Sequence, residues 1–248
     1  MTWRAVVAAL DEHAAFRSSV SPYLHPLAGR SALWHVVRAL LDVAPPPREV
    51  VVLHLAGSPA HVDVGTSAPV RFVAVAPGDL LRALRVAVTP PGQTVLVDGA
   101  AALLTSATVS RLLRAAEHGL AAVHGDTELA ACVAVAGEGP ALASADDPRL
   151  PAGAARVAPA AAIELLQVTS RHTLSDAAVA LRDRLVRRHE RAGVSFLLPA
   201  STWIDVDVRI GADTLIYPSV VLEGASEIGG ECVIGPYSRV VDSVVGRG

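Results

Sequence analysis

Aliphatic residues recur at every sixth position near the C-terminus of this chain. Helices place side chains on one face about every 3.6 residues and strands about every two, so neither produces this period. A six-residue period is typical of a parallel β-helix, where each short strand directs one aliphatic side chain into the coil. We therefore expect about two to three coils, with a core of Ile204, Ile210, Ile216, Leu222, Ile228, Ile234 and Val240.

A second regular position supports this prediction. Four residues after each aliphatic residue stands a small or β-branched one, suited to tight corners: Val208, Thr214, Val220, Ser226, Cys232, Ser238 and Val244. The alternative is a β-sandwich segment with accidental spacing, which we disfavour because two positions keep register through seven repeats. An uncapped coil end invites edge pairing. We expect the last coil to be covered by a partner subunit, to be frayed, or to continue in a longer natural chain.

Charge and cysteine content narrow the class of protein. The 248-residue chain has a net charge of −3, so we expect no broad attraction to nucleic acid or to anionic membranes. Five arginines between Arg182 and Arg191 are interpreted as the solvated face of a helix. The two cysteines, Cys132 and Cys232, suggest no disulfide framework and are consistent with a reducing compartment. Cys232 is predicted to be a buried, inert thiol.

Targeting signals are not evident in the sequence. The apolar run before Asp11 is too short for a signal peptide, and no uncharged apolar stretch is long enough to span a membrane. We therefore expect a cytoplasmic protein. None of the histidines pairs with another histidine or a cysteine at metal-ligand spacing, so no metal site is expected from them.

The chain before the repeat alternates between predicted strands and helices. Such alternation predicts an open α/β sheet. The expected strands are Ala5–Leu10, Glu49–Leu55, Val70–Val75, Thr94–Val97, Ala121–His124 and Ala131–Val135. The expected helices are Ser31–Val43, Asp79–Val86, Thr105–Glu117 and Leu174–Ala192. Residues 137–162 are predicted to be loop, and Thr173 with Asp176 is spaced as a capping box for the last helix.

Several segments resemble the bacterial GlmU family. They are Leu24–Arg30 (LHPLAGR), Arg187–Val194 (RRHERAGV), Pro199–Asp205 (PASTWID), Ile210–Pro218 (IGADTLIYP), Val233–Pro236 (VIGP) and Val240–Ser243 (VVDS). That family joins an N-acetylglucosamine-1-phosphate uridylyltransferase domain to a left-handed β-helix acetyltransferase domain. The resemblance implies a nucleotidyltransferase-like α/β domain over residues 1–172, a connecting helix over 173–193 and a left-handed β-helix over 194–248. It also implies a homotrimer.

The phosphate-binding positions of the family are changed here. Its Leu-Ala-Ala-Gly-x-Gly-Thr-Arg loop brings backbone N–H groups to the phosphates. Without gaps, the loop falls on Ala8 to Ala15, so its functional positions hold Asp11, Glu12, His13, Ala14 and Ala15. A carboxylate about 4 Å from a phosphate would cost about 4 kcal/mol, or roughly a thousandfold in affinity. The alternative for Asp11 and Glu12 is a cation or acid/base site, but we favour a solvated loop.

The metal-binding positions implied by the resemblance are also altered. The family's magnesium-binding aspartate falls on Ala100 and its asparagine on Thr169, while its uridine-contacting Gly-Thr-Gly falls on 79–81. Magnesium requires carboxylate or carbonyl oxygen, which alanine does not offer. Asp98 is a rescue candidate, since a shift of two residues along a strand restores the face.

These changes predict a GlmU-like protein without catalysis of its own. The chain stops before the family's acetyltransferase histidine and coenzyme A contacts, and no histidine follows His189. We expect a structural, regulatory or ligand-binding homologue related to UDP-N-acetylglucosamine synthesis, with no cofactor and with a sugar nucleotide as its candidate ligand. The alternatives are a divergent magnesium-dependent sugar-1-phosphate nucleotidyltransferase and a truncated hexapeptide-repeat acyltransferase.

Overall fold

The computed structural model describes residues 2–10, 14–58, 62–63, 65, 69–124, 133–149 and 152–248. The chain forms two compact units. The first consists of Met1–His25 and Ser31–Thr173, and the second consists of Pro26–Arg30 and Leu174–Gly248. The boundary between them therefore falls inside the helix that follows residue 170. None of the helices in the described ranges is both long enough and apolar enough to cross a bilayer.

The first unit is built on a seven-stranded sheet of order β5-β4-β1-β6-β8-β7-β9. Its strands are β1 (Trp3–Ala9), β4 (Val50–Leu55), β5 (Val70–Val75), β6 (Gln93–Asp98), β7 (Ala121–Val123), β8 (Ala134–Glu138) and β9 (Ala155–Arg156). The pairs formed by β1, β4, β5 and β6 are parallel, whereas β8 is antiparallel to both β6 and β7. The predicted α/β open sheet is thus present, and its antiparallel pairs are those that β8 forms with β6 and β7.

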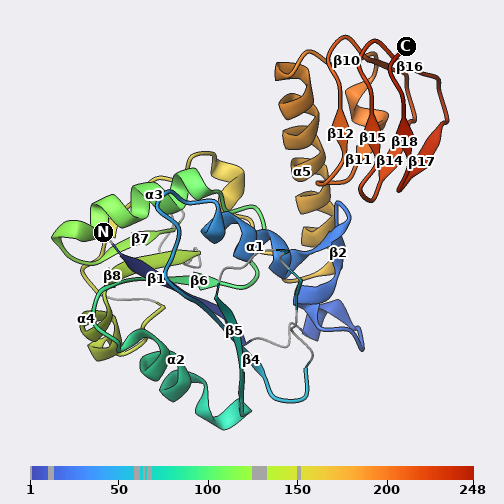
Figure 1. Ribbon diagram of the computed structural model, residues 1–248. Coiled ribbons are helices and arrows are strands. Elements are labelled where there is room, and N and C mark those ends of the chain that lie inside the picture. The colour runs from blue at the N-terminus through green and yellow to red at the C-terminus, as the bar shows by residue number, and fades with distance from the viewer. Residues whose placement is uncertain are drawn as a thin grey trace. The chain divides into compact units, whose positions relative to one another are not determined.

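Helices cover both faces of this sheet (Figure 1). On one face α1 (Ala32–Leu41) and α3 (Ser106–Ala115) pack on the odd-numbered residues of β1. On the other face α2 (Leu80–Val88) and α4 (Gly139–Ser144) pack on Val6 and Ala8. Ser31 and Thr105 cap α1 and α3, since each side chain accepts a backbone N–H of the first turn.

The prediction of loop over residues 137–162 is wrong in part. The segment contains α4 and β9, together with the end of β8. Pro140 stands at the start of α4, where its missing N–H costs nothing, and Leu142 is fully buried against the α2 face. Tertiary packing therefore stabilises a helix too short to be recognised from its own periodicity.

The long helix α5 (Arg171–Arg191) begins earlier than its sequence pattern predicts. Its N-cap is Ser170, whose hydroxyl accepts the Thr173 N–H at 3.2 Å. The Thr173 hydroxyl accepts the Ser170 N–H in return, at 3.0 Å. This reciprocal pair has the geometry of a capping box. The predicted box from Thr173 to Asp176 is thus displaced by one turn.

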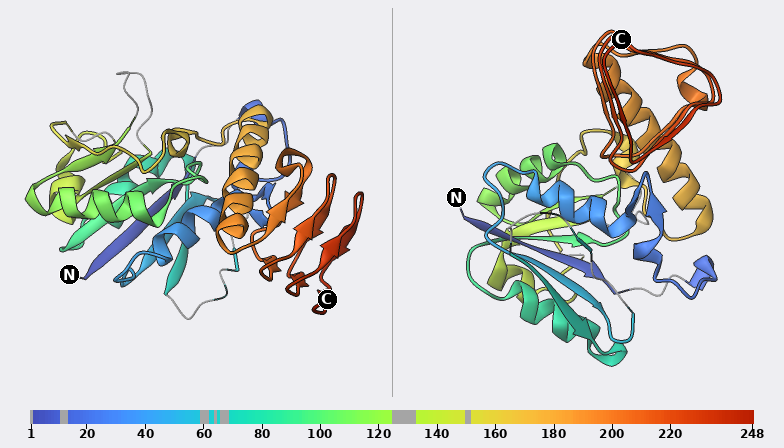
Figure 2. Two further views of the ribbon diagram at one scale, coloured as in Figure 1. Left: turned by 90° about the horizontal axis from the view of Figure 1, so that it is seen from above. Right: turned by 45° about the vertical axis from the view of Figure 1, so that its right-hand side comes forward.

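The second unit contains nine short strands that form three parallel sheets. The sheets are β10-β13-β16, β11-β14-β17 and β12-β15-β18. The strands are β10 (Ser195–Phe196), β11 (Trp203–Ile204), β12 (Arg209–Ile210), β13 (Leu215–Ile216), β14 (Val221–Glu223), β15 (Glu227–Ile228), β16 (Val233–Ile234), β17 (Arg239–Val241) and β18 (Val244–Val245). Figure 2 shows them winding into a three-sided parallel coil.

The aliphatic repeat fills this coil. One buried cluster contains Ile204, Ile210, Ile216, Leu222, Ile228 and Ile234, and Val240 packs against it while partly exposed. The second repeated position is also buried from Val208 to Cys232, but Val244 is 77% exposed. The register explains this exception. Arg209 pairs with Glu227, eighteen residues later, but Glu227 pairs with Val244, seventeen residues later.

A segment from the N-terminal part of the chain belongs to the second unit. Pro26–Arg30 contains β2 (Pro26–Leu27) and the start of β3 (Arg30–Ser31). The Val206 N–H donates to the Ala28 carbonyl at 3.0 Å, and Arg30 Nε donates to Asp207 at 2.6 Å. Gly29 has a φ of +81°, and a Cβ there would lie 2.6 Å from the Asp205 Cγ. Only glycine therefore allows this close approach.

The arginines of α5 are not all solvated. Arg182 donates to Asp183 and to the Ala200 carbonyl, and Arg188 donates to the Val206 carbonyl. Arg187, Arg188 and Arg191 are exposed. The interpretation of the arginine cluster as a solvated face therefore holds for part of it, while Arg182 and Arg188 tie the helix to the coil. Cys232 is a buried thiol whose Sγ lies 3.0 Å from the Gly246 carbonyl, whereas Cys132 lies outside the described residues.

His189 is buried in the last turn of α5. Within the described part of the chain, its buried Nε2 has no hydrogen-bond partner. Burial, and after it the charge of Arg188, lowers the pKa of His189 from 6.5 to about 4. The unfolded chain therefore binds a proton as the pH falls through 6.5, whereas the folded chain does not until about pH 4.

We predict that His189 makes the protein less stable as the pH falls from 6.5 to 4. The stabilisation is fully present above pH 6.5, and its loss amounts to about 3 kcal/mol at about 1.4 kcal/mol per pKa unit. Urea unfolding between pH 4 and 8 measures this slope. His189→Leu should flatten it, while His118→Gln, at an exposed histidine, should not. Equal slopes in wild type and His189→Leu would contradict the assignment.

Candidate functional site

The carboxyl ends of β1 and β6 meet where the strand order of the sheet reverses. From β1 the chain continues outward to β4 and β5, then returns to form β6 on the other side of β1. Ala8 and Asp98 are paired at this end, and the Gly99 N–H donates to the Ala8 carbonyl at 2.9 Å. Open α/β sheets bind ligands at such a switch point. We therefore take this edge as the candidate functional site.

Backbone segments approach each other closely here. A Cβ on Gly99 would lie 3.0 Å from the Cα of Ala9 and 3.0 Å from Cε1 of Tyr23. Real Cβ atoms rarely approach so closely, so glycine allows the turn after β6 to lie against the end of β1. The residues expected to replace the phosphate loop follow β1. Of these, Asp11, Glu12 and His13 lie outside the described residues, as does the side chain of Ala14, while Ala15 is exposed.

The two positions matched to metal ligands are brought together. Ala100 follows β6 and is buried, and its carbonyl accepts the Val168 N–H at 2.9 Å. Thr169 is the next residue, and its own N–H donates to the Thr173 hydroxyl at 2.9 Å. Residues 100 and 169 thus converge although they are far apart in sequence. The Ala100 side chain is buried in the hydrophobic core, and Thr169 is half-buried.

Asp98 is the carboxylate closest in sequence to Ala100, and both of its oxygens are engaged. Oδ1 accepts the Ala100 N–H at 2.8 Å, and Oδ2 accepts Nε2 of Gln167 at 3.2 Å. Asp98 and Ala100 do not lie on the same face of a strand as expected, because β6 ends at Asp98 and Ala100 lies in the turn beyond it. The side chain of Asp98 therefore fixes the turn and the neighbouring 167–169 segment.

An aromatic pair lies in the segment that follows β1. The Phe16 and His25 rings are stacked with centroids 4.8 Å apart, and the Phe16 carbonyl accepts Nε of Arg171 at 3.0 Å. Nε2 of His25 is buried and, among the described residues, has no hydrogen-bond partner. Burial and then the charge of Arg171 lower the pKa of His25. A neutral, packed imidazole of this kind supports the segment sterically.

Glu164 is a buried carboxylate that sequence reasoning missed. It accepts the Thr105 N–H at 2.9 Å, the Thr105 hydroxyl at 3.0 Å and the Ala161 N–H at 3.1 Å. These bonds join the start of α3 to the turn at 162–165, which gives Glu164 a structural role. No local pattern could have revealed it, since Thr105 lies 59 residues away.

The remaining predicted positions do not form a ligand cluster. Asp79 is exposed and ends a short 3-10 turn, Leu80 begins α2, and Leu81 is 44% exposed. In the described ranges, three or more histidine, cysteine, aspartate or glutamate residues nowhere gather in a way that could hold a metal ion. The donor set at residues 98–100 and 167–169 does not fit a magnesium ion, because its one carboxylate is occupied and its other groups are weak ligands.

Comparison with curated proteins gives a local but clear similarity. The chain is 47% identical over 83 residues to the bifunctional protein GlmU of Bacillus velezensis, a match that covers 34% of this chain and 18% of the relative. It is 44% identical over 103 residues to GlmU of Mycolicibacterium gilvum, covering 42% and 18%. Over its matched stretch the chain is similar to GlmU. The chain spans less than a fifth of the length of these relatives, and no protein-family model matches it.

Solved structures with a similar fold are nucleotidyltransferases. A nucleotidyl transferase from Methanothermobacter thermautotroptrophicus is 19% identical, with a TM-score of 0.53 over 75% of this GlmU-like chain and 99% of that one. A 2-C-methyl-D-erythritol 4-phosphate cytidylyltransferase from Thermus thermophilus is 17% identical, with a TM-score of 0.52 over 73% and 100%. At these identities the likeness establishes the fold of the α/β unit and leaves its chemistry open.

We predict that Asp98→Asn destabilises the protein by about 1–2 kcal/mol, because charge-assisted hydrogen bonds are lost and an amide donor faces Gln167. The matched control is Asp79→Asn, at an exposed aspartate, which should change stability by less than about 0.5 kcal/mol. Urea unfolding of both variants measures the difference. Equal midpoints for Asp98→Asn and wild type would contradict the bonding described for Asp98.

Proposed function

We propose that the chain is a GlmU-like protein, related to UDP-N-acetylglucosamine synthesis, that has lost uridylyl transfer and acts as a structural or ligand-binding homologue. One observation carries the proposal. The N–H of Val168, next to Thr169, donates to the Ala100 carbonyl, yet the two positions that the resemblance assigns to metal ligands hold alanine and threonine. Magnesium requires oxygen ligands to neutralise a nucleotide's phosphates. Such a site retains the fold of a nucleotidyltransferase without its electrostatics.

The proposed function does not include the acetyl-transfer activity of GlmU. No histidine occurs in the sequence after His189, so the coil carries no imidazole base. His189 itself is buried, and its lowered pKa belongs to a packed side chain. The candidate ligand of the first unit is a sugar nucleotide bound without magnesium.

The competing hypothesis is an active, divergent sugar-1-phosphate nucleotidyltransferase. It depends on Asp98, whose carboxylate lies beside Ala100. For Asp98 to bind Mg²⁺, its bonds to the Ala100 N–H and Gln167 would have to be exchanged for the metal. We favour the inactive homologue because that exchange would also release the turn after β6.

A catalytic assay separates the two hypotheses. With UTP, N-acetylglucosamine-1-phosphate and Mg²⁺, the purified protein should release no pyrophosphate above the protein-free background. Calorimetry should detect no Mg²⁺ binding to wild type. The double variant Ala100→Asp/Thr169→Asn introduces two oxygen ligands and should gain measurable Mg²⁺ affinity. Because residue 100 is buried, thermal unfolding is used to verify that the variant is folded. Metal-dependent pyrophosphate release by the wild-type chain would refute the proposed loss of activity.

We further propose that the coil is a left-handed β-helix and that the protein is a homotrimer. The short parallel strands, the eighteen-residue register and the six-residue aliphatic spacing support the first part. Exposed apolar residues on the coil support the second, including Val233, Tyr237 and Val244. Light scattering after size exclusion should give about 77 kDa, three times the 25.6 kDa of one chain. A clean monomer at micromolar concentration would exclude the trimer.

A further inference from the structure

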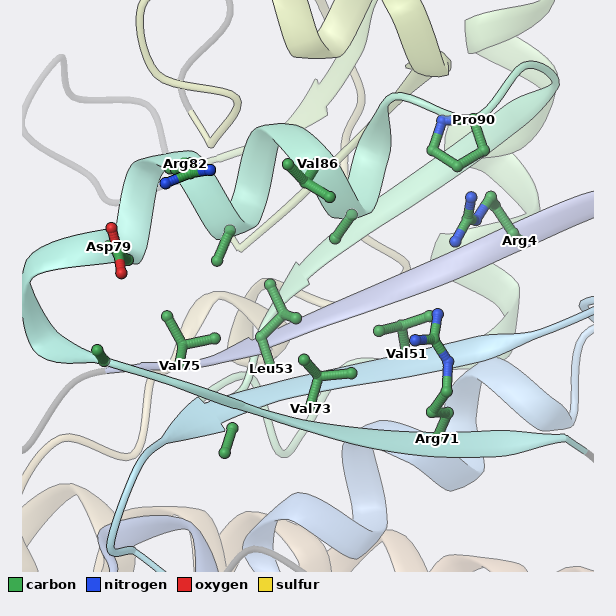
Figure 3. Close-up of a pocket in the computed structure, with 14 residues that line it drawn as sticks. Arg4, Val51, Leu53, Arg71, Val73, Val75, Asp79, Arg82, Val86 and Pro90 are labelled. Carbon is green, nitrogen blue, oxygen red and sulfur yellow. The ribbon is translucent and has the colours of Figure 1, made fainter.

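A cavity of about 500 Å³ lies on the α2 face of the first unit, away from the carboxyl ends of β1 and β6. Its floor comes from β4 and β5, and α2 covers it (Figure 3). The floor is apolar, formed by Val51, Leu53, Val73 and Val75. The helix adds Val86, which is 67% exposed. Cavities of this size and character are typical of small-molecule sites.

Charged groups stand at one end of this apolar floor. Arg4 of β1 and Arg71 of β5 line the cavity there (Figure 3). Both are held by Glu49. Arg4 donates to its Oε2 at 3.2 Å, and Arg71 donates through two nitrogens to its Oε1 at 3.1 and 3.2 Å. One carboxylate is thus shared between two guanidinium groups, which leaves an excess of positive charge.

Arg4 is the unusual member of this group. It is 5% exposed, and its Nε is buried without a hydrogen-bond partner among the described residues. A buried charged group is costly unless its donors are satisfied. Burial lowers the pKa of Arg4 even though Glu49 acts in the opposite direction. An anion at this end of the cavity would add acceptors for Arg4 and Arg71, which share the single carboxylate of Glu49.

The other charged groups of the lining do not cancel this excess. Arg82 and Asp79 lie near the start of α2. Counting Glu49, three arginines face two carboxylates, and the charge of Arg48 also acts on Arg4, so positive charge is in excess at this end of the cavity. This excess favours a ligand with a negatively charged head group.

The length and apolar character of the floor favour an aliphatic chain in the part of the ligand beyond its head group. From Arg71 to Val75 the strand advances about 13 Å at ~3.3 Å per residue, and Val73 and Val75 along it are apolar. The side chains of the floor offer no hydrogen-bonding groups to sugar hydroxyls or a nucleobase. An unbranched aliphatic chain along the floor would bury apolar surface and retain its head group beside the arginines.

We propose that this cavity binds a medium-chain carboxylate, with the carboxylate at Arg4 and Arg71 and the aliphatic chain between α2 and the β4–β5 floor. Arg71 is the group expected to provide a bidentate contact, because it is 60% exposed and able to turn from Glu49 toward the ligand. The site is independent of the proposed function, since it uses neither the switch point nor the coil.

Calorimetry with decanoate tests the proposal on the full-length protein. We expect saturable binding at one site per chain, no binding of decylamine, and weaker binding of the uncharged decanol. Arg71→Ala should weaken decanoate binding by roughly tenfold, the scale of one charged hydrogen bond. Ala87→Phe, which fills the cavity from α2, should abolish it. The matched control is Arg114→Ala, at an exposed arginine on α3, which should bind as wild type does.

Three results would overturn the proposal. The first is the absence of saturable decanoate binding at millimolar concentration. The second is equal binding of decylamine, which would exclude charge recognition by the arginines. The third is unchanged affinity in both Arg71→Ala and Ala87→Phe, which would place any bound decanoate elsewhere. Thermal unfolding of each variant without ligand verifies that it is folded, so that a loss of binding reports on the cavity.

Discussion

The pairing of β1 with strands on both of its sides is the constraint on which the first unit depends. All seven residues of β1 are buried, and parallel hydrogen bonds join it to β4 and to β6. Its alternation assigns Val7 to one core and Val6 to the other, and Arg4 occupies the second face. One strand therefore positions the switch point at its carboxyl end and the arginine-lined cavity toward its amino end.

Much of the architecture could be predicted because it depends on local periodicity. The six-residue spacing from Ile204 to Val240 identifies the residues inside the coil, and Ser31 and Thr105 mark where two helices begin. The pattern fails at Val244, where the coil register shortens by one residue. It also fails at α4, whose stability depends on burial of Leu142 against another part of the fold.

The candidate site could be predicted only in part, because its contacts join residues that are far apart in sequence. Resemblance placed Ala100 and Thr169 at ligand positions, and the bond from Val168 to Ala100 is consistent with their convergence. The pairing of Asp98 with Gln167 joins residues 69 apart in sequence. The gathering of Arg4 and Arg71 around Glu49 also joins three distant segments. No sequence window contains such groups together, so three-dimensional packing alone reveals them.

Function in this chain therefore has to be argued from side chains rather than from architecture. A nucleotidyltransferase fold supports many chemistries, and its activity depends on a few oxygen ligands and backbone amides. At residues 100 and 169, the positions matched to metal ligands hold alanine and threonine within a nucleotidyltransferase-like fold. On the α2 face, in contrast, Arg4 and Arg71 lie beside an apolar floor.

The attachment of Pro26–Arg30 to the second unit has a consequence for how the protein is assembled. Asp205 and Val206 contact Gly29 and Ala28, which are synthesised long before the coil. A fragment beginning at Leu174 would lack this segment, and Asp207 would lose its ion pair with Arg30. The two units are thus interlaced along the polypeptide. A cut in the sequence before Leu174 therefore removes Pro26–Arg30 from the unit to which it belongs.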